Sequence, residues 1–372
     1  MREPDPPSRP SQPVRFHKGR GTGSNAPSRF EVWRREADQD HRAPGADDDE
    51  EEIGAARPAT TVTGQSARSI IARNDSPDIP FDQSINPYQG CEHGCVYCYA
   101  RPTHAYLGLS PGLDFETRIF AKTNAAELLR AELRRPGYAP ALIALGSNTD
   151  PYQPAERRLG ITRSVLELLS ECRLPVSITT KSALVTRDID LLAGMAERGL
   201  VRVHISVGTL DRELARRMEP RAPTPARRIE AMRELAAAGI PVGVFASPLI
   251  PAINDVDLER VLEAAAAAGA SDASFVILRL PLEVRDLFVE WLEHHYPLRA
   301  AHVMSLVRQM RQGRDYDPDF EQRMRGSGIH ARLIEQRFRI AAARCGLAAE
   351  HVPMDVSAFR PPPADPAQAS LF

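Results

Sequence analysis

Three cysteines on one short segment are the residues best suited to chemistry in this chain of 372 residues. Cys91, Cys95 and Cys98 lie within the run GCEHGCVYCY, although the whole chain holds only five cysteines. Disulfides at this spacing are strained, and an odd, low number of cysteines argues against a disulfide-stabilised secreted protein. Because closely spaced thiolates are preferred ligands of zinc and of iron–sulfur clusters, the segment predicts a metal centre.

Two kinds of metal centre fit three thiolates. A structural zinc site needs a fourth ligand, for which His93 and His104 are candidates, and the chain would then be a non-catalytic zinc-binding protein. A four-iron four-sulfur (4Fe–4S) cluster would instead use the thiolates for three irons and leave the fourth iron open. An open metal position distinguishes a catalytic centre from a closed one, so this alternative predicts an enzyme.

The elements that must position these cysteines alternate between short apolar runs and longer amphipathic stretches. Strands are expected at residues 81–86, 141–145, 176–179, 201–207, 242–246 and 274–278. Helices are expected between them at 124–135, 154–172, 188–198, 225–238 and 257–268, with Gly199, Gly239 and Gly269 marking three helix ends. This alternation predicts an α/β fold with parallel strands, either an open doubly wound sheet or a partial barrel.

Small and polar residues follow several of these strands. Gly146, Ser147 and Asn148 come after the second strand, Lys181 after the third and Ser206 after the fourth. Ligands of parallel α/β folds bind at the carboxyl ends of the strands, and the first strand leads to the cysteine segment at that same end. We therefore expect these residues to face the metal centre.

The CxxxCxxC pattern, with the aromatic Tyr97 before its last cysteine, resembles the radical S-adenosylmethionine (SAM) enzymes. The runs NPYQGCEHGCVYCYARPTHAYLG, LGSNTDPYQPAE, TKSALVTRD and MEPRAPTPARR resemble the branch close to spore photoproduct lyase, a DNA-repair enzyme. The resemblance covers about residues 76 to 300 and implies a partial (β/α)6 barrel. It implies that a 4Fe–4S cluster cleaves SAM reductively to a 5′-deoxyadenosyl radical, which takes hydrogen from an unidentified substrate. It also implies an electron donor such as flavodoxin or ferredoxin.

The resemblance assigns further contacts to the cofactor. Tyr97 would lie against the SAM adenine, and the stretch from Gly146 to Asn148 stands where the family usually has a motif touching the methionine amine. That motif often contains glutamate, which is absent here, so Ser147 and Asn148 would supply the oxygen acceptors. Tyr99 is a weak candidate for a hydrogen relay, because an aromatic residue in a short loop more often packs.

Lys181 is a candidate partner for the SAM carboxylate. It is one of three lysines in a chain whose other basic residues are arginines, and an ammonium is a compact point charge. The alternative is a solvated surface lysine. Ser206, and more weakly Ser247, are candidates for a ribose hydroxyl contact, although serines at strand ends often only satisfy the backbone.

The lyase resemblance also provides a test of the reaction. Spore photoproduct lyase uses an extra cysteine near its second strand to return hydrogen to the repaired thymine, and residues 139–145 here contain none. A different reaction is the simpler inference, with DNA-lesion repair as the alternative. The net charge of −2 does not support a nucleic-acid partner. Acidic residues also interrupt the arginine-rich region after residue 307, which favours a solvated helical face.

Composition divides the chain into three parts. Residues 1–66 are rich in proline, glycine and acidic residues and predict a disordered tail, although the patch from Gly19 to Gly23, with Phe30 and Trp33, could dock on the body. Residues 67–297 are expected to form the radical SAM core, and residues 298–372 a helical extension with a proline-rich end. No apolar run predicts a membrane span or a signal peptide, so a cytoplasmic protein is expected.

Overall fold

The computed structural model describes residues 14–30, 58–320, 322–348 and 353–363, and its centre is a sheet of seven strands in the order β10-β9-β8-β7-β6-β3-β2. Six strands run parallel, and β2 (Ile71–Arg73) is antiparallel to β3 at one edge. The parallel strands are β3 (Gln83–Ile85), β6 (Ile143–Leu145), β7 (Val176–Thr180), β8 (Val201–Ser206), β9 (Val242–Leu249) and β10 (Asp272–Ile277). All six expected strands are therefore confirmed.

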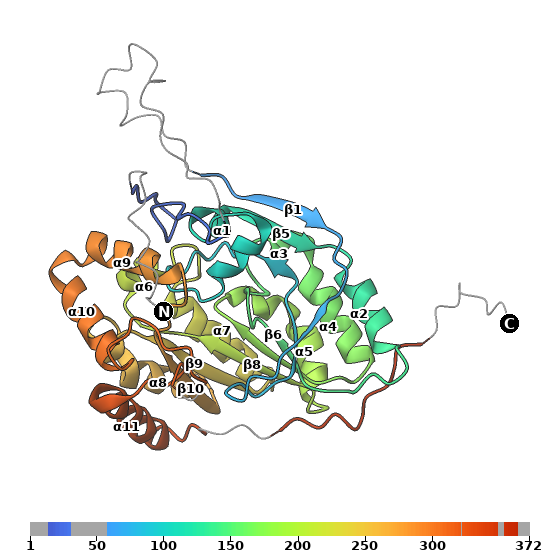
Figure 1. Cartoon of the computed structure of the whole chain (residues 1–372). Coiled ribbons are helices and arrows are strands. Elements are labelled where there is room, and N and C mark those ends of the chain that lie inside the picture. Colours follow the sequence, from blue (N-terminus) through green and yellow to red (C-terminus); the bar gives the residue numbers. More distant parts are fainter. Residues whose placement is uncertain (1–13, 31–57, 321, 349–352, 364–372) are drawn as a thin grey trace, which may run out of the picture.

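Helices follow these strands in turn and cover the sheet, which gives the partial (β/α)6 barrel (Figure 1). They are α2 (Ala125–Leu133), α3 (Glu156–Leu159), α4 (Ile161–Glu171), α5 (Ile189–Ala196), α6 (Arg212–Met218), α7 (Pro225–Ala237) and α8 (Leu258–Ala267). The single helix expected over 154–172 is divided, because Gly160 adopts a left-handed conformation with φ of 64° and ends α3. The strand β8 buries Val201, Val203 and Ile205, as expected for a parallel sheet covered by helices.

A second, three-stranded sheet was not expected from the sequence. The strand β5 (Arg118–Lys122) lies between β1 (Thr61–Gln65) and β4 (Tyr88–Gln89), parallel to the first and antiparallel to the second. The short helix α1 (Leu113–Thr117) precedes β5. Because β4 ends two residues before Cys91, this small sheet fixes the start of the cysteine segment.

The N-terminal region differs from the expected disordered tail. Residues 14–30, which we call the strap, pack on the body, and Thr22 and Ser24 are buried. The backbone N–H groups of Gly21 and Thr22 donate to the buried carboxylate of Glu116 at 2.9 and 3.1 Å. A buried carboxylate needs donors, and this glycine-rich segment supplies them. The patch from Gly19 to Gly23 therefore docks on the body. Trp33 and the acidic run after residue 46 lie outside the described residues.

The C-terminal helices are α9 (Val284–His295), α10 (Pro297–Gln309) and α11 (Gly328–Arg344), and the last two lie in the stretch expected to be helical. Phe288, Trp291 and Val303 share a hydrophobic cluster with Cys95 and Tyr97. The helical extension therefore packs directly against the cysteine segment, and the domain boundaries at residues 67 and 297 stay a prediction. No helix among the described residues is long and apolar enough to cross a membrane.

The end of α9 gives the protein a specific sensitivity to acid. The His295 ring packs 5.3 Å from the rings of Phe16 and Trp291. Burial, followed by the charges of His294 and Arg217, lowers the pKa of His295 to about 4. A pKa below the ordinary value of 6.5 means that protonation favours the unfolded chain. Stability should therefore fall as the pH drops from 6.5 toward 4.

We expect this histidine to account for about 1 kcal/mol of the stability lost between pH 7 and pH 5, since solvent screens a half-buried ring. Urea unfolding of wild type and His295→Gln at both pH values measures this difference. His302→Gln, which removes an exposed imidazole on α10, is the control. An equal loss of stability in wild type and His295→Gln would contradict the assignment.

Candidate active site

The cysteine segment follows β4 without regular secondary structure, wound into short turns. Gly94 N–H donates to the Cys91 carbonyl at 3.3 Å, and Cys98 N–H donates to the Cys95 carbonyl at 3.2 Å. Cys91 and Cys95 are buried, Cys98 is half-buried, and all three are free thiols. Burial, then the charges of Asp150, Cys95 and Cys98, raises the pKa of Cys91.

Each candidate imidazole already has a polar partner at one ring nitrogen. His93 Nδ1 lies 3.3 Å from the Asp150 carboxylate, and His104 Nε2 lies 3.0 Å from the Arg118 carbonyl. Within the described ranges, no three histidine, cysteine or acidic side chains are grouped as ligands of a single ion. Three thiolates on one short segment suit a cluster, in which each thiolate binds a different iron.

Residues after β6 hold the cysteine segment in place. The Gln153 side chain accepts from Glu92 N–H at 3.0 Å and donates to the Gly90 carbonyl at 3.1 Å. Thr149 Oγ1 donates to the Tyr88 carbonyl at 2.8 Å. These contacts lie on both sides of Cys91 and fix its backbone. Sequence reasoning missed this role of Gln153, although the residue stands in the quoted run LGSNTDPYQPAE.

Asp150, in the same run, connects the cysteine segment to β7. Its carboxylate accepts from Thr180 Oγ1 at 2.6 Å and from Lys181 N–H at 2.7 Å. Burial alone would raise the pKa of Asp150, but His93 and these hydrogen bonds hold it at about 2. The carboxylate is therefore ionised and fixes the backbone at Lys181 beside the cysteine segment.

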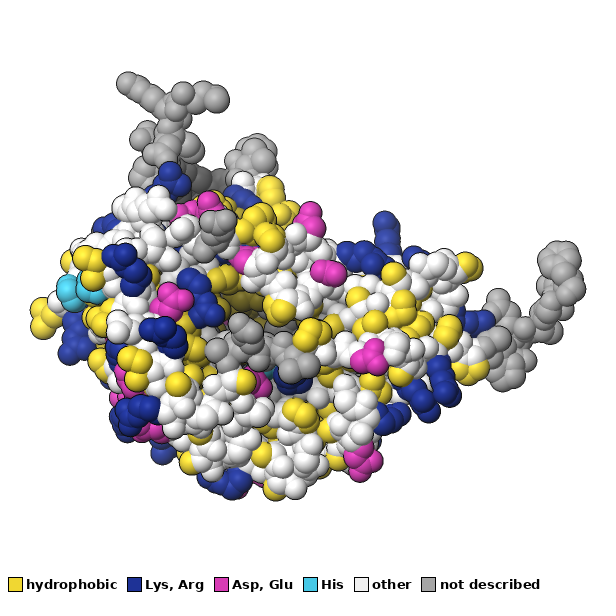
Figure 2. Space-filling model, turned by 90° about the horizontal axis from the view of Figure 1, so that it is seen from below, with side chains coloured by type: hydrophobic (Ala, Val, Ile, Leu, Met, Phe, Trp, Pro, Cys, Tyr) yellow, Lys and Arg dark blue, Asp and Glu magenta, His cyan; other side chains and the backbone are white. Residues whose placement is uncertain are grey.

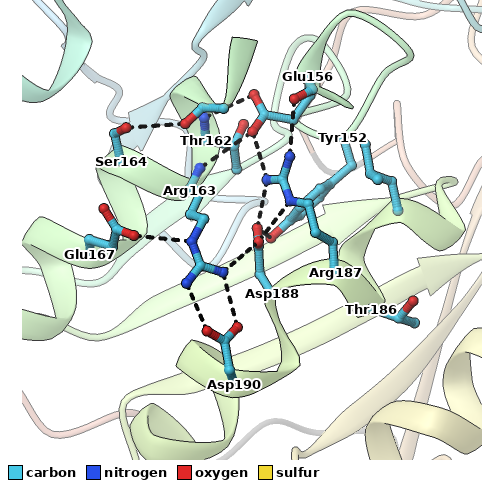
Figure 3. A network of polar contacts seen from close by, with 12 residues as sticks. Tyr152, Glu156, Thr162, Arg163, Ser164, Glu167, Thr186, Arg187, Asp188 and Asp190 are labelled. Atoms are coloured by element: carbon cyan, nitrogen blue, oxygen red, sulfur yellow. Dashed lines mark hydrogen bonds and ion pairs between the residues drawn. The ribbon is translucent and has the colours of Figure 1, made fainter. Parts of the chain in front are cut away.

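A network of ion pairs is centred on Glu156, Arg187 and Asp188 (Figure 3). The fully buried Glu156 accepts from the Tyr88 hydroxyl and pairs with Arg187 at 2.8 Å. Arg187 also pairs with Asp188 at 2.8 Å, and Asp188 accepts from the Tyr152 hydroxyl at 3.1 Å. The network joins α3 to the short helix η3 (Ala183–Asp188) and, through Tyr88, to the start of the cysteine segment.

Glu156→Gln should lower the free energy of unfolding by about 2 kcal/mol, because Arg187 loses one of its two buried counter-charges and keeps only Asp188. The matched control is Glu167→Gln, which removes a half-exposed partner of Arg163 and should cost about 0.5 kcal/mol. Chemical unfolding of both variants measures the difference. Equal losses of unfolding free energy in the two variants would show that the buried network does not stabilise the protein more than an exposed pair does.

A buried group of charges lies beside Cys95. The Tyr97 hydroxyl donates to Glu219, and Glu219 pairs with Arg228. Lys181 Nζ lies 5.9 Å from the centre of the Tyr97 ring. Burial alone would raise the pKa of Glu219, but Arg228 and Lys181 hold it below its usual range. Glu219 and Arg228 were not predicted from the sequence as site residues, although both stand in the quoted run MEPRAPTPARR.

In the turn after β6, the backbone of Gly146 passes close to the backbone of Thr179. Gly146 has φ of 88°, and a Cβ atom there would lie 2.1 Å from the Thr179 carbonyl oxygen, so glycine is required. Asn86 holds the turn by donating to Ser147 Oγ at 3.1 Å and accepting from Asn148 N–H at 2.9 Å. The Ser147 hydroxyl oxygen, predicted to accept from SAM, therefore already accepts from Asn86.

The remaining predicted residues have different surroundings. Ser206 is buried at the end of β8, and its carbonyl accepts from Arg228 at 3.0 Å. Ser247 Oγ accepts from Val276 N–H at 2.8 Å, so it serves the backbone of β10. Tyr99 is half-exposed, donates to the Ser147 carbonyl, and has the Arg279 guanidinium 5.2 Å above its ring.

Comparisons with known proteins agree with this arrangement. The family model of the radical SAM superfamily matches residues 85–265. Uncharacterized proteins of Mycobacterium tuberculosis and Mycobacterium bovis are 36% identical over 300 residues, covering 79% of this chain and 83% of the relatives. An uncharacterized protein of Methanocaldococcus jannaschii is 31% identical over 173 residues, which are 46% of this chain and 62% of that protein. The chain belongs to the radical SAM superfamily.

Solved structures show the same fold. Spore photoproduct lyase, in a mutant with bound AdoMet and dinucleoside spore photoproduct, superimposes with a TM-score of 0.53 at 18% identity. The match covers 78% of this chain and 82% of the lyase. The likeness in fold confirms the partial barrel, whose strand ends surround the cysteine segment.

Proposed function

We propose that this protein cleaves SAM reductively, with a 4Fe–4S cluster held by Cys91, Cys95 and Cys98. The spacing of three free thiols on one segment, in a chain that matches the radical SAM family model, carries this proposal. When bound, the cluster supplies one electron to the sulfonium of SAM, which yields methionine and a 5′-deoxyadenosyl radical. Apolar side chains of α6, α9 and α10 pack against Cys95 and Tyr97 and shield these two residues from water.

Lys181 supports SAM binding at this place. Its ammonium makes no ion pair within 4 Å in the part of the chain that the structure describes, although Cys95 and Glu219 raise its pKa against the opposing effect of burial. A protonated, unpaired lysine beside the cysteine segment would attract the carboxylate of SAM. Tyr97 lies next to it and would contact the same molecule, with its hydroxyl fixed by Glu219.

Metal analysis of protein purified without oxygen tests the cluster assignment. We expect about four iron and four sulfide ions per chain, a brown colour, and a change in the electron paramagnetic resonance of the reduced protein when SAM is added. Zinc at one ion per chain, with no iron after reconstitution, would replace the proposal with the structural zinc site.

Repair of a DNA lesion is a second candidate, because the fold match to spore photoproduct lyase spans most of both chains. Against it, residues 139–145, which lead into β6, contain no cysteine. On the face drawn in Figure 2, acidic side chains stand among the basic ones around a central hollow, so its described residues form no uninterrupted basic patch. Incubation with SAM, dithionite and irradiated DNA decides: formation of 5′-deoxyadenosine without lesion reversal would reject repair.

A further inference from the structure

A groove of about 770 Å³ lies against the outer side of the cysteine segment. The strap, the residues that lead into β1, the helix α3 and the turn after α6 form its walls (Figure 1). Its charged lining consists of five cations and one carboxylate: Lys18, Arg20, Arg157, Arg158, Arg221 and Glu92. The groove is therefore strongly basic, in a protein whose formal net charge is −2.

Most of these positive charges have no carboxylate to neutralise them. Lys18, Arg157 and Arg158 are exposed and form no ion pair with other described residues. The buried Arg20 donates to the Glu116 carbonyl at 3.2 Å and to Thr60 Oγ1 at 3.0 Å, which are uncharged oxygens.

The remaining cation, Arg221, is paired with Glu92 at 2.8 Å. Burial, followed by the charge of Arg221, lowers the pKa of Arg20 against the opposing effects of Glu116 and Glu92, so the cations that line this groove crowd one another. Such crowding favours an anionic partner.

A second groove shows that this charge is a local property. The groove between α2 and α4, of about 640 Å³, has Arg130 and Arg134 alongside three glutamates. Arg130 there pairs with Glu171 at 3.0 Å. Its carboxylates outnumber its cations by one, so it offers no comparable attraction to an acidic surface.

The basic groove is next to the cysteines and apart from the candidate SAM contacts. Glu92, in its floor, directly follows Cys91, and Pro154 directly follows Gln153, which hydrogen-bonds both neighbours of Cys91. None of the residues predicted to contact SAM lines the groove. A protein seated there would approach the metal centre while SAM and substrate occupy the barrel.

We propose that this groove docks an acidic one-electron carrier protein of the flavodoxin or ferredoxin class. This inference rests on the proposed function. One electron leaves the reduced flavin or iron–sulfur centre of the carrier and enters the cluster, so the carrier is oxidised and the cluster reduced with no transfer of a proton or group. Opposite charges on the two surfaces raise the association rate and make it fall as salt increases.

The charge-reversal variant Arg157→Glu/Arg158→Glu tests the proposal in the reconstituted full chain. The matched control is Arg332→Glu/Arg339→Glu, which reverses two exposed charges on α11, on the opposite side of the molecule (Figure 1). Cluster reduction is followed by absorbance after mixing with a reduced flavodoxin or ferredoxin. Photoreduced deazaflavin, a small reductant, is used in parallel.

We expect the groove variant to be reduced by the carrier proteins about tenfold more slowly than wild type at low salt, and at an unchanged rate by deazaflavin. Added salt should slow wild type and the control but hardly affect the variant. Equal rates in wild type and the groove variant, or a wild type that deazaflavin reduces but neither carrier does, would overturn the proposal. Because cluster reduction is measured directly, this outcome is separate from a failure to cleave SAM.

Discussion

Replacing Cys95 with alanine is expected to remove the cluster and all SAM cleavage, leaving a colourless protein. Cys95 is buried on the segment where three thiols gather, and two thiolates cannot hold three irons. Alanine at Cys91 or Cys98 should have the same effect. Iron content and 5′-deoxyadenosine formation under dithionite measure the result.

Cys345→Ala is the matched control, because Cys345 directly follows α11 and lies outside the candidate site. It should keep its iron and its activity while removing the same chemical group. Full iron content in Cys95→Ala, or a loss of iron in Cys345→Ala, would contradict the assignment of the ligands.

Glu219→Ala is expected to lower the free energy of unfolding by about 3–5 kcal/mol. The substitution leaves the buried Arg228 guanidinium without its counter-charge and the Tyr97 hydroxyl without its acceptor. Glu213→Ala is the control, because Glu213 forms only exposed pairs with Arg216 and Arg217 and its loss should cost much less stability. Urea unfolding of the apoprotein measures both.

A double variant separates stability from SAM binding. Glu219→Leu/Arg228→Met replaces the pair with apolar side chains and should recover most of the stability lost in Glu219→Ala. It should still bind SAM about tenfold more weakly, because Tyr97 and Lys181 lose the charge that positions them. Undiminished SAM affinity in this double variant would show that the buried pair only supports the fold.

The main sheet could be predicted because its signals are local. In VRVHIS the apolar residues recur at every second position, which is the period of a strand, and Val201, Val203 and Ile205 are all buried. Three predicted helix ends also coincide with left-handed glycines, at Gly199, Gly239 and Gly269. The conformational preference of one glycine and a period of two in apolar residues can both be recognised without knowing the tertiary structure.

The small sheet and the strap could not be predicted, because distant residues hold them. The strand β4 has only two residues, and β1 is mostly exposed and shows no apolar alternation. The strap has no periodicity, and a carboxylate about 95 positions away in the chain binds it. The three cysteines are close in the sequence, so their spacing alone identified them. Glu219 is 122 positions from Tyr97, so their pairing could not be predicted.

The most direct test of the central claim is the fate of SAM in the reconstituted protein under a strong reductant. We predict that 5′-deoxyadenosine and methionine form in equal amounts, that neither forms without reductant, and that the Cys95→Ala variant produces neither. A protein whose cluster is fully reduced in the presence of SAM, yet leaves the SAM intact, would contradict the account.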